Sequence, residues 1–276
     1  MTIYYDQLTW PDINEAVAAK KIPVLAVGSV EQHGPHLPLN TDWLQAHRIV
    51  EEAARRSDGR LLVMPPVQYG YITHAMDFPG TITIHWQHLI DFCLDITKSL
   101  AYHGFKKMII VNGHGSNAPV LDLVARRTNL ETDACCAFLD WWELLNVDPA
   151  FNARWRETSF PSGAHADEME TSMMLYLMPD RVKKDKAGSH QPPHTSKFLW
   201  SDATKGSGPV HITGWTSAGG SNGTFGRADL GTAEKGQIIF EEAVKQLLAF
   251  AKELDQRPYR PRVDHHDQPP TTPVPG

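Results

Sequence analysis

Continuous apolar runs alternate with amphipathic stretches through most of the chain. The apolar runs are IPVLAVGSV (22–30), RLLVMPPVQYG (60–70), KKMIIVNGHGS (106–116) and DACCAFLDWW (133–142). Because their hydrophobic residues follow one another without alternation, they predict parallel strands that are buried on both faces. The stretches with helical periodicity cover 10–20, 42–56, 85–104, 118–130, 167–179 and 232–254. This order predicts an α/β fold, a three-layer α/β/α sandwich with a mostly parallel sheet.

No internal repeat and no change of composition divides the chain before its end. We therefore expect a single domain over residues 1–256. The ending, residues 257–276, is rich in proline, and we expect it to be a poorly ordered tail.

Composition and charge argue against several classes of partner. The formal net charge is -6 without a basic block, so neither nucleic acid nor an anionic membrane is expected as a partner. No apolar run approaches the roughly 18 residues of a membrane span, and the N-terminus lacks a signal-peptide core. Cys93, Cys135 and Cys136 form no disulfide framework and no CxxC pattern. We therefore expect a cytoplasmic protein.

Ligand-type side chains follow two of the predicted strands. Glu31 and His33 come directly after the first strand, with Asp42 a few residues further on, and His114 follows the third strand. In open α/β sheets the carboxyl ends of the strands form the ligand-binding edge. An ordinary polar loop would explain the first segment alone, but two such segments at one edge favour a binding site.

A third segment, SGAHADEMETS, places His165, Glu168 and Glu170 around the start of an apolar helix. Acids in a first helical turn commonly compensate the helix dipole, which is worth about 0.3–1 kcal/mol each. That explanation fits Glu170 less well, because Glu170 shares the apolar face of the helix with Met173 and Met174. A buried carboxylate is costly unless it is paired or binds a metal.

Imidazoles and carboxylates together suit Zn²⁺, Mn²⁺ or Fe²⁺. A carboxylate that bridges two ions would make a two-metal site, which can activate water near neutral pH and polarise a carbonyl group. An unperturbed imidazole titrates near pH 6.5, so a histidine in such a site can transfer protons.

Five motifs in this order resemble the creatininase (creatinine amidohydrolase) family: GSVEQHGPHLPLNTD, FPGTI, VNGHGSN, GAHADEMETS and GTAEKG. The resemblance extends from about residue 20 to 245. It implies a creatininase-like layered α/β fold, two divalent metal ions per chain and hydrolysis of an amide-type bond in a small molecule. It also implies a homo-oligomer, possibly a hexamer.

The resemblance also implies roles for single residues. Glu31 would bind the first metal, His33 and His114 the second, and Asp42 would bridge the two. His165 would contact the substrate and carry protons. Zn²⁺ is expected, with Mn²⁺ or Fe²⁺ as alternatives at the first site.

The chain departs from creatininases at two positions. Ser116 stands where creatininases have a metal-binding glutamate, and Glu168 stands where they have an apolar residue. We therefore expect Glu168 to supply the missing oxygen ligand and Glu170 to act beside it, as a base or by orienting a ligand. The two acids could exchange these roles, because the start of a helix cannot be oriented accurately from sequence.

The expected substrate-binding side chains are scattered along the chain: Thr73, His74, Ser116, Trp141, Trp142 and Asn222. For the two tryptophans, burial in the core is the alternative for at least one. Many family members carry Ser and Glu-His before FPGT, whereas this chain has Ile72, His74 and Ala75. This difference and Ser116 argue against creatinine as the substrate.

Three functions stay open at this point. The first is hydrolysis of an amide-type C–N bond, as in a cyclic amide or a formamide. The second is hydrolysis of a C–C, ester or lactone bond on the same scaffold, as in the opening of an oxidised inositol ring. The third is a non-catalytic protein that binds a metal or another ligand.

Overall fold

A computed structural model describes residues 2–190, 195–258, 262–268 and 270–272. Its central sheet has four parallel strands in the order β2-β1-β3-β4. The strands are β1 (Ile22–Val27), β2 (Leu61–Val63), β3 (Lys107–Asn112) and β4 (Cys135–Asp140). All six residues of β1 are buried, as its unbroken apolar run predicts. The predicted parallel sheet is confirmed.

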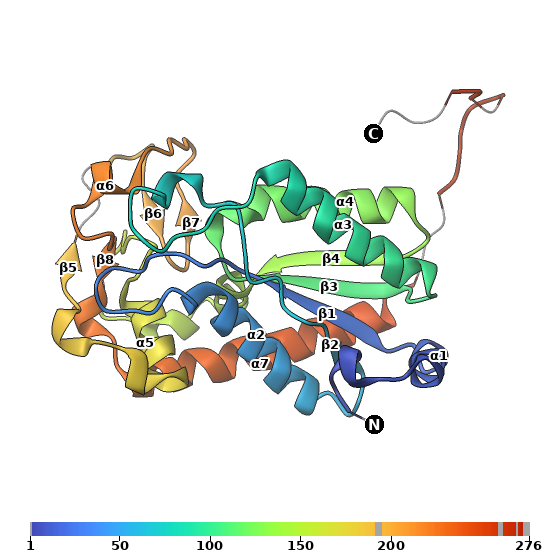
Figure 1. The fold of residues 1–276 in the computed structure, drawn as a ribbon, viewed down its shortest axis with the longest axis horizontal. Helices are drawn as coiled ribbons and strands as arrows, with labels where there is room; N and C mark the ends of the chain where they lie inside the picture. Colours follow the sequence, from blue (N-terminus) through green and yellow to red (C-terminus); the bar gives the residue numbers. More distant parts are fainter. Residues whose placement is uncertain (1, 191–194, 259–261, 269, 273–276) are drawn as a thin grey trace.

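Helices cover both faces of this sheet (Figure 1). The longer ones are α1 (Trp10–Ala18), α2 (Thr41–Arg55), α3 (Trp86–Tyr102), α4 (Ala118–Glu131), α5 (Glu168–Leu177) and α7 (Ala233–Gln256). A short helix, α6, spans Thr216–Gly219. In Figure 1, α3 and α4 lie on one side of the sheet and α2 and α7 on the other. The three-layer α/β/α prediction is therefore confirmed.

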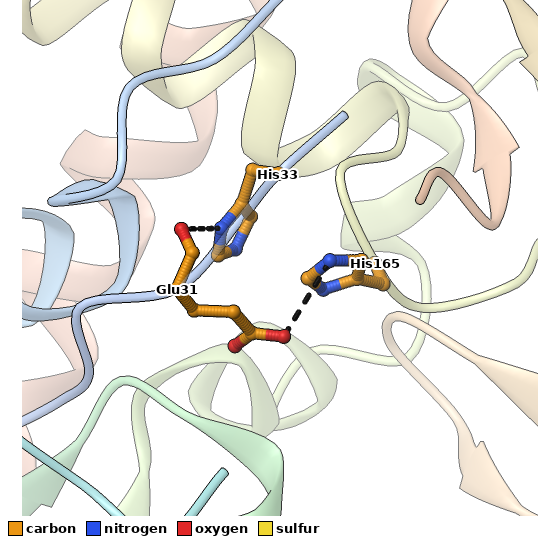
Figure 2. A group of neighbouring side chains, drawn as sticks. All are labelled: Glu31, His33 and His165. Carbon is orange, nitrogen blue, oxygen red and sulfur yellow. Dashed lines mark hydrogen bonds and ion pairs between the residues drawn. The ribbon is translucent and has the colours of Figure 1, made fainter. Parts of the chain in front are cut away.

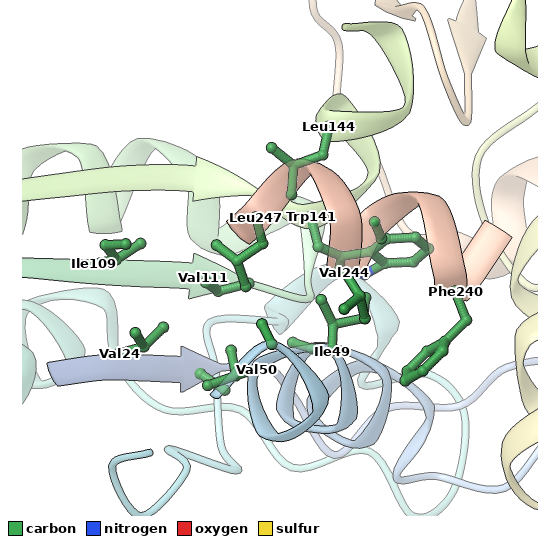
Figure 3. Close-up of a cluster of buried hydrophobic side chains, with 14 of the residues drawn as sticks. Val24, Ile49, Val50, Ile109, Val111, Trp141, Leu144, Phe240, Val244 and Leu247 are labelled. Carbon is green, nitrogen blue, oxygen red and sulfur yellow. The ribbon is translucent and has the colours of Figure 1, made fainter. Parts of the chain in front are cut away.

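Alternate residues of the strands supply the two cores. Val24 and Ile109 face a cluster with α2 and α7 (Figure 3). Leu25 and Ile110 face a second cluster with α3 and α4. Burial of each such side chain contributes about 1.5–3 kcal/mol to the stability of the fold. Packing on both faces therefore stabilises the sheet, and the polar loops follow the carboxyl ends of its strands.

Strand β2 is shorter than its apolar run because Pro65 and Pro66 follow it. Proline has no N–H to donate to a neighbouring strand. Pairing resumes at Val67, which forms an isolated bridge to Val27. The chain thus leaves the sheet at the prolines and returns to the end of β1.

Short elements gather near the carboxyl ends of the central strands (Figure 1). Two small antiparallel sheets pair β5 (Ser189–His190) with β8 (Gly226–Arg227) and β6 (Ser201–Asp202) with β7 (Gly206–Ser207). The 3-10 helices are η1 (Tyr5–Gln7), η2 (Thr73–Ala75), η3 (Gly115–Asn117), η4 (Trp141–Asn146), η5 (Phe151–Arg154), η6 (Pro179–Arg181), η7 (Lys184–Lys186) and η8 (Ala228–Leu230).

None of the helices in the described residues has the length and apolar character needed to cross a membrane. The division into a domain over 1–256 and a tail over 257–276 stays a prediction. Part of that tail lies outside the described residues.

Candidate metal centre

Two glycines bring the start of α2 against the ends of β1 and β3. A Cβ on Gly113 would lie 2.2 Å from the carbonyl oxygen of Asp42, and a Cβ on Gly28 would lie 2.4 Å from the backbone nitrogen of Trp43. Real Cβ atoms do not approach other atoms so closely. The glycines after β1 and β3 therefore place Asp42 directly beside the residues that follow both strands.

This close approach leads to a prediction for Gly113→Ala. The added methyl group should push the first turn of α2 away, destabilise the fold by about 1–3 kcal/mol and weaken metal binding. Thermal unfolding and a chelator titration measure the two effects. Gly115→Ala is the matched control, because a Cβ there meets nothing within 4 Å. Equal thermal stability and equal metal affinity of the two variants would contradict the prediction.

The buried carboxylate of Asp42 lies between two imidazoles. Its Oδ1 is 2.9 Å from His33 Nε2, and its Oδ2 is 2.9 Å from His114 Nδ1. Ser29 Oγ donates a hydrogen bond of 2.6 Å to the same Oδ2. Each oxygen of Asp42 thus faces a different histidine, which is the arrangement that a bridging carboxylate needs.

One further carboxylate completes each side. Glu31 Oε2 is 2.9 Å from His114 Nδ1, and Glu170 Oε2 is 3.6 Å from His33 Nε2. Two groups that share Asp42 result, Glu31–Asp42–His114 and His33–Asp42–Glu170. A third group, Glu31–His33–His165, does not include Asp42, and the ligand atoms within each group lie within 4.8 Å of one another. His114 therefore lies with Glu31 and Asp42, and not with His33 as the resemblance implied.

Backbone carbonyl groups fix the orientation of both imidazoles. His33 Nδ1 donates to the carbonyl oxygen of Glu31 (3.2 Å), and His114 Nε2 donates to that of Tyr71 (3.2 Å). A carbonyl oxygen only accepts, so these nitrogens carry the protons. The other nitrogens, His33 Nε2 and His114 Nδ1, are left to face the carboxylates, each 2.9 Å from an oxygen of Asp42. Metal-binding histidines are commonly oriented in this way.

The charges of the site also fit a cation. Burial alone would lower the pKa of His33, but Asp42 and Glu170 raise that pKa well above its usual value. Burial also opposes charge on His114, yet Glu31 and Asp42 raise its pKa to about 10. Without a metal, protons on the imidazoles offset the carboxylates. Divalent ions would displace these protons, since histidine binds a metal in its neutral form.

His165 lies next to this group, on the loop before α5. Its Nε2 is 3.6 Å from Glu31 Oε1 (Figure 2), and its ring is 4.4 Å from that of His33. Burial, together with the nearby His33, lowers the pKa of His165 to about 3. Its imidazole is therefore uncharged at neutral pH.

Gln32 holds His165, and sequence reasoning missed this residue. The backbone carbonyl oxygen of Gln32 is 3.0 Å from His165 Nε2, and its side-chain Nε2 is 2.9 Å away. The amide orientation is fixed, because Gln32 Oε1 accepts from Gly34 N and Gln32 Nε2 donates to the carbonyl oxygen of Gly223. The position of Gln32 between two expected ligands, Glu31 and His33, was the signal in the sequence.

Glu168 does not lie in either metal group. Its carboxylate is 2% exposed and is bound by Lys235 Nζ (2.7 Å) and by the backbone nitrogens of Glu157 (3.0 Å) and Thr158 (2.8 Å). Residues two apart on a helix point in nearly opposite directions, so Glu168 and Glu170 face opposite sides of α5. The structure therefore brings Glu170, and not Glu168, to the histidines.

Trp141 does not line a pocket. It is 1% exposed and packs in the core cluster with Phe240 and Val244 (Figure 3). Trp142 is half-buried and packs against the same cluster. The alternative of core packing thus describes Trp141, because the chain turns into η4 at the end of β4 and directs this side chain inward.

The other expected substrate residues lie on loops around the metal groups. His74, on η2, interacts electrostatically with Glu31 and His114, and burial lowers its pKa. Ser116 is half-buried on η3, two residues after His114. Asn222 Oδ1 accepts from Thr224 N in the loop that contacts Gln32. Thr73 is exposed, and its hydroxyl contacts that of Thr83 at 3.4 Å.

Comparisons with known proteins agree with these observations. The family model described as "Creatininase: Creatinine amidohydrolase" matches residues 6–251. The chain is 28% identical to creatinine amidohydrolase of Pseudomonas putida, over 91% of this chain and 97% of the relative. It is 27% identical to 3-dehydro-scyllo-inosose hydrolase of Thermotoga maritima (91% and 82%) and 30% identical to a mycofactocin precursor peptide peptidase of Mycobacterium ulcerans (86% and 82%).

Solved structures give the same result. A creatininase described with Mn superposes with a TM-score of 0.78 at 29% identity, covering 92% of this chain and 99% of the other. A mutant creatininase of Zn-Zn type has the same TM-score, identity and coverage. The resemblance that the five motifs predict is therefore confirmed, and the chain belongs to the creatininase family of metal-dependent hydrolases.

Proposed function

We propose that this protein is a dinuclear metal hydrolase that cleaves an amide-type C–N bond in a small molecule. The observation that carries the proposal is the pair of oriented imidazoles on the two oxygens of Asp42 (2.9 Å each). Two groups that share one carboxylate suit two ions a short distance apart. A non-catalytic protein with a degenerate site is less well supported, because each of the two groups that share Asp42 has one nitrogen and two carboxylate ligands.

Glu31, Asp42 and His114 would hold the first ion, and His33, Asp42 and Glu170 the second. Glu170 thus replaces Glu168 in the proposed ligand set and is no longer proposed as a base. Zn²⁺ or Mn²⁺ is supported by the solved relatives, which are described with these metals, and Fe²⁺ at the first site stays a prediction. Bound there, the ions would supply activation of a water molecule and polarisation of the substrate carbonyl group.

His165 is proposed as the proton carrier. As the attacking water forms its bond to the carbonyl carbon, the uncharged imidazole would accept the proton of this water at Nε2 and pass it to the nitrogen as the C–N bond breaks. The pKa of about 3 makes the protonated imidazole short-lived and a strong proton donor. Gln32 supports both states of this atom. A protonated Nε2 donates to the carbonyl oxygen of Gln32, whereas an unprotonated Nε2 accepts from the side-chain amide of Gln32. His165 is thus held in place before and after the transfer.

The substrate is proposed to lie over the first-metal side, between His74, Ser116 and the loop that carries Asn222. Open space above Gly115, where a Cβ meets nothing within 4 Å, supports access from this side. The exposed hydroxyl of Thr73 and the half-buried ring of Trp142 stay proposals for its outer wall. A cytoplasmic location and a homo-oligomer, possibly a hexamer, also stay predictions.

A second candidate reaction is hydrolysis of a C–C, ester or lactone bond, as in the opening of an oxidised inositol ring. The Thermotoga maritima relative named 3-dehydro-scyllo-inosose hydrolase supports it, since the match covers 91% of this chain. Both reactions need attack of an activated water on a carbonyl group, and product analysis separates them.

The proposal predicts two divalent ions per chain in protein loaded with Zn²⁺ or Mn²⁺. Elemental analysis measures the ions, and a panel of creatinine, formamides, short peptides and oxidised inositols measures activity. Hydrolysis of a panel amide that disappears with a chelator and returns with the metal is the expected result. Fewer than two bound ions after loading would contradict the dinuclear proposal.

A further inference from the structure

A buried ion pair joins the first residue of α5 to the first turn of α7. Glu168 Oε1 is 2.7 Å from Lys235 Nζ, and the two side chains are 2% and 12% exposed. The lysine also donates to the carbonyl oxygen of Leu230 (2.9 Å) and to Glu157 Oε1 (2.5 Å). All three N–H groups of Lys235 are therefore used.

The carboxylate of Glu168 is equally well bound. It accepts hydrogen bonds from the backbone nitrogens of Glu157 and Thr158 and from the hydroxyl group of Thr158. Hydrogen bonds to a charged partner are about twice as strong as neutral ones. Removal of either member of a buried pair leaves an uncompensated charge, so this pair strongly favours one position of the start of α5.

Close packing keeps α5 and α7 in one register. A Cβ on Gly236 would lie 2.0 Å from the carbonyl oxygen of Ser172, so only glycine allows the helices to approach in this way. Ser172 Oγ donates to the carbonyl oxygen of Glu168 (2.6 Å) and accepts from Thr232 N (3.2 Å). The first turn of α5 is thus fastened to α7 through side chain and backbone.

Glu170 leaves the same turn on its opposite side. Its Oε2 accepts from Ala166 N (2.5 Å) and lies 3.6 Å from His33 Nε2. Bonds from a carboxylate to Zn²⁺ are about 2.0–2.2 Å long, so a small rotation of this turn would move Glu170 out of bonding range.

We propose that the Glu168–Lys235 ion pair positions Glu170 for the second metal group, and that Glu168 and Lys235 are positioning residues. The inference rests on the proposed function, because it requires a metal at His33, Asp42 and Glu170. It gives the acid at position 168 a role that does not involve contact with the ion.

The experiment is a competition titration of Zn²⁺ against a chromophoric chelator, with the full chain in metal-free form. Lys235→Met and Glu168→Gln should each lower the affinity for the second ion by about 10–100-fold, as the loss of residues around the metal ligands typically does. The affinity for the first ion should stay within about twofold of the wild-type value. Lys245→Met is the matched control, because Lys245 pairs with Glu242 on the same helix at 3.0 Å but is 65% exposed. Lys245→Met should change the affinity for neither ion.

A double-mutant cycle separates positioning from general destabilisation. On a Glu170→Gln background, Lys235→Met should add less than about twofold to the loss of the second ion, because coupled residues are not additive. Lys235→Arg, which keeps the charge, should recover part of the affinity. If Lys235→Met does not fold, Glu168→Gln and Lys235→Arg carry the same comparison.

Unchanged affinity for the second ion in these variants would overturn the inference, as would an equal loss of both ions in folded protein. Failure of the proposed function is distinguishable, because it appears in the wild-type protein as fewer than two bound Zn²⁺ ions. Two ions in the wild type with unaffected variants would reject the positioning role alone.

Discussion

Asp42→Ala should lose both metal ions and all measurable hydrolysis. Asp42 is the shared member of the two groups, with one oxygen 2.9 Å from each histidine. Loss of a group outside the ligand shell typically costs about 10–100-fold in metal affinity, and loss of a direct ligand of both ions should cost more at each site. Elemental analysis after loading and dialysis measures the result.

Two controls make this prediction specific. His33→Ala should retain the ion held by Glu31, Asp42 and His114, because it removes a member of the other group only. Asp122→Ala, on the outer surface of α4 and paired with Arg126, should retain both ions. Full metal occupancy in folded Asp42→Ala would reject the bridging role.

The second large effect is expected for His165→Ala. Proton transfer by a positioned side chain typically contributes about 10²–10⁴-fold to the rate, so kcat should fall by that factor on an amide substrate identified from the panel. Both ions should stay bound, because His165 belongs to neither of the two groups that share Asp42 and groups only with Glu31 and His33. Steady-state kinetics and metal analysis on the same preparation measure the two quantities.

His85→Ala, at an exposed position before α3, is the control for loss of an imidazole. It should leave kcat and the number of bound ions nearly unchanged. A variant of His165 with unchanged kcat would assign the proton transfer to another group. Loss of one ion together with activity would place His165 among the ligands, with Glu31 and His33.

Sequence patterns predicted the sheet and its helices because both depend on local composition. The runs around Val24 and Ile109 are apolar without alternation, and such runs are strands covered on both faces. The small sheets formed by β5, β6, β7 and β8 were not predicted in this way, because two-residue strands have no detectable periodicity. The early end of β2 follows from Pro65, which breaks the pairing.

The metal-side residues were predicted because each follows a strand or starts a helix within a long motif. The choice between Glu168 and Glu170 could not be made, since it depends on Lys235, 67 residues further along the chain. The partner of His114 could not be predicted for the same reason. Glu31 follows β1 and His114 follows β3, and the two meet only because these strands pair in the sheet. Tryptophan is a residue type that often lines substrate pockets, but the turn into η4 buries Trp141.

A crystal structure of the metal-loaded protein, with anomalous diffraction measured at the metal edge, tests the two-metal proposal most directly. The expected map has two peaks on opposite sides of the Asp42 carboxylate, one against Glu31 and His114 and the other against His33 and Glu170. Glu168 should remain on Lys235 without contact to either peak. A single peak, or a peak bound by Glu168, would contradict the proposed dinuclear centre.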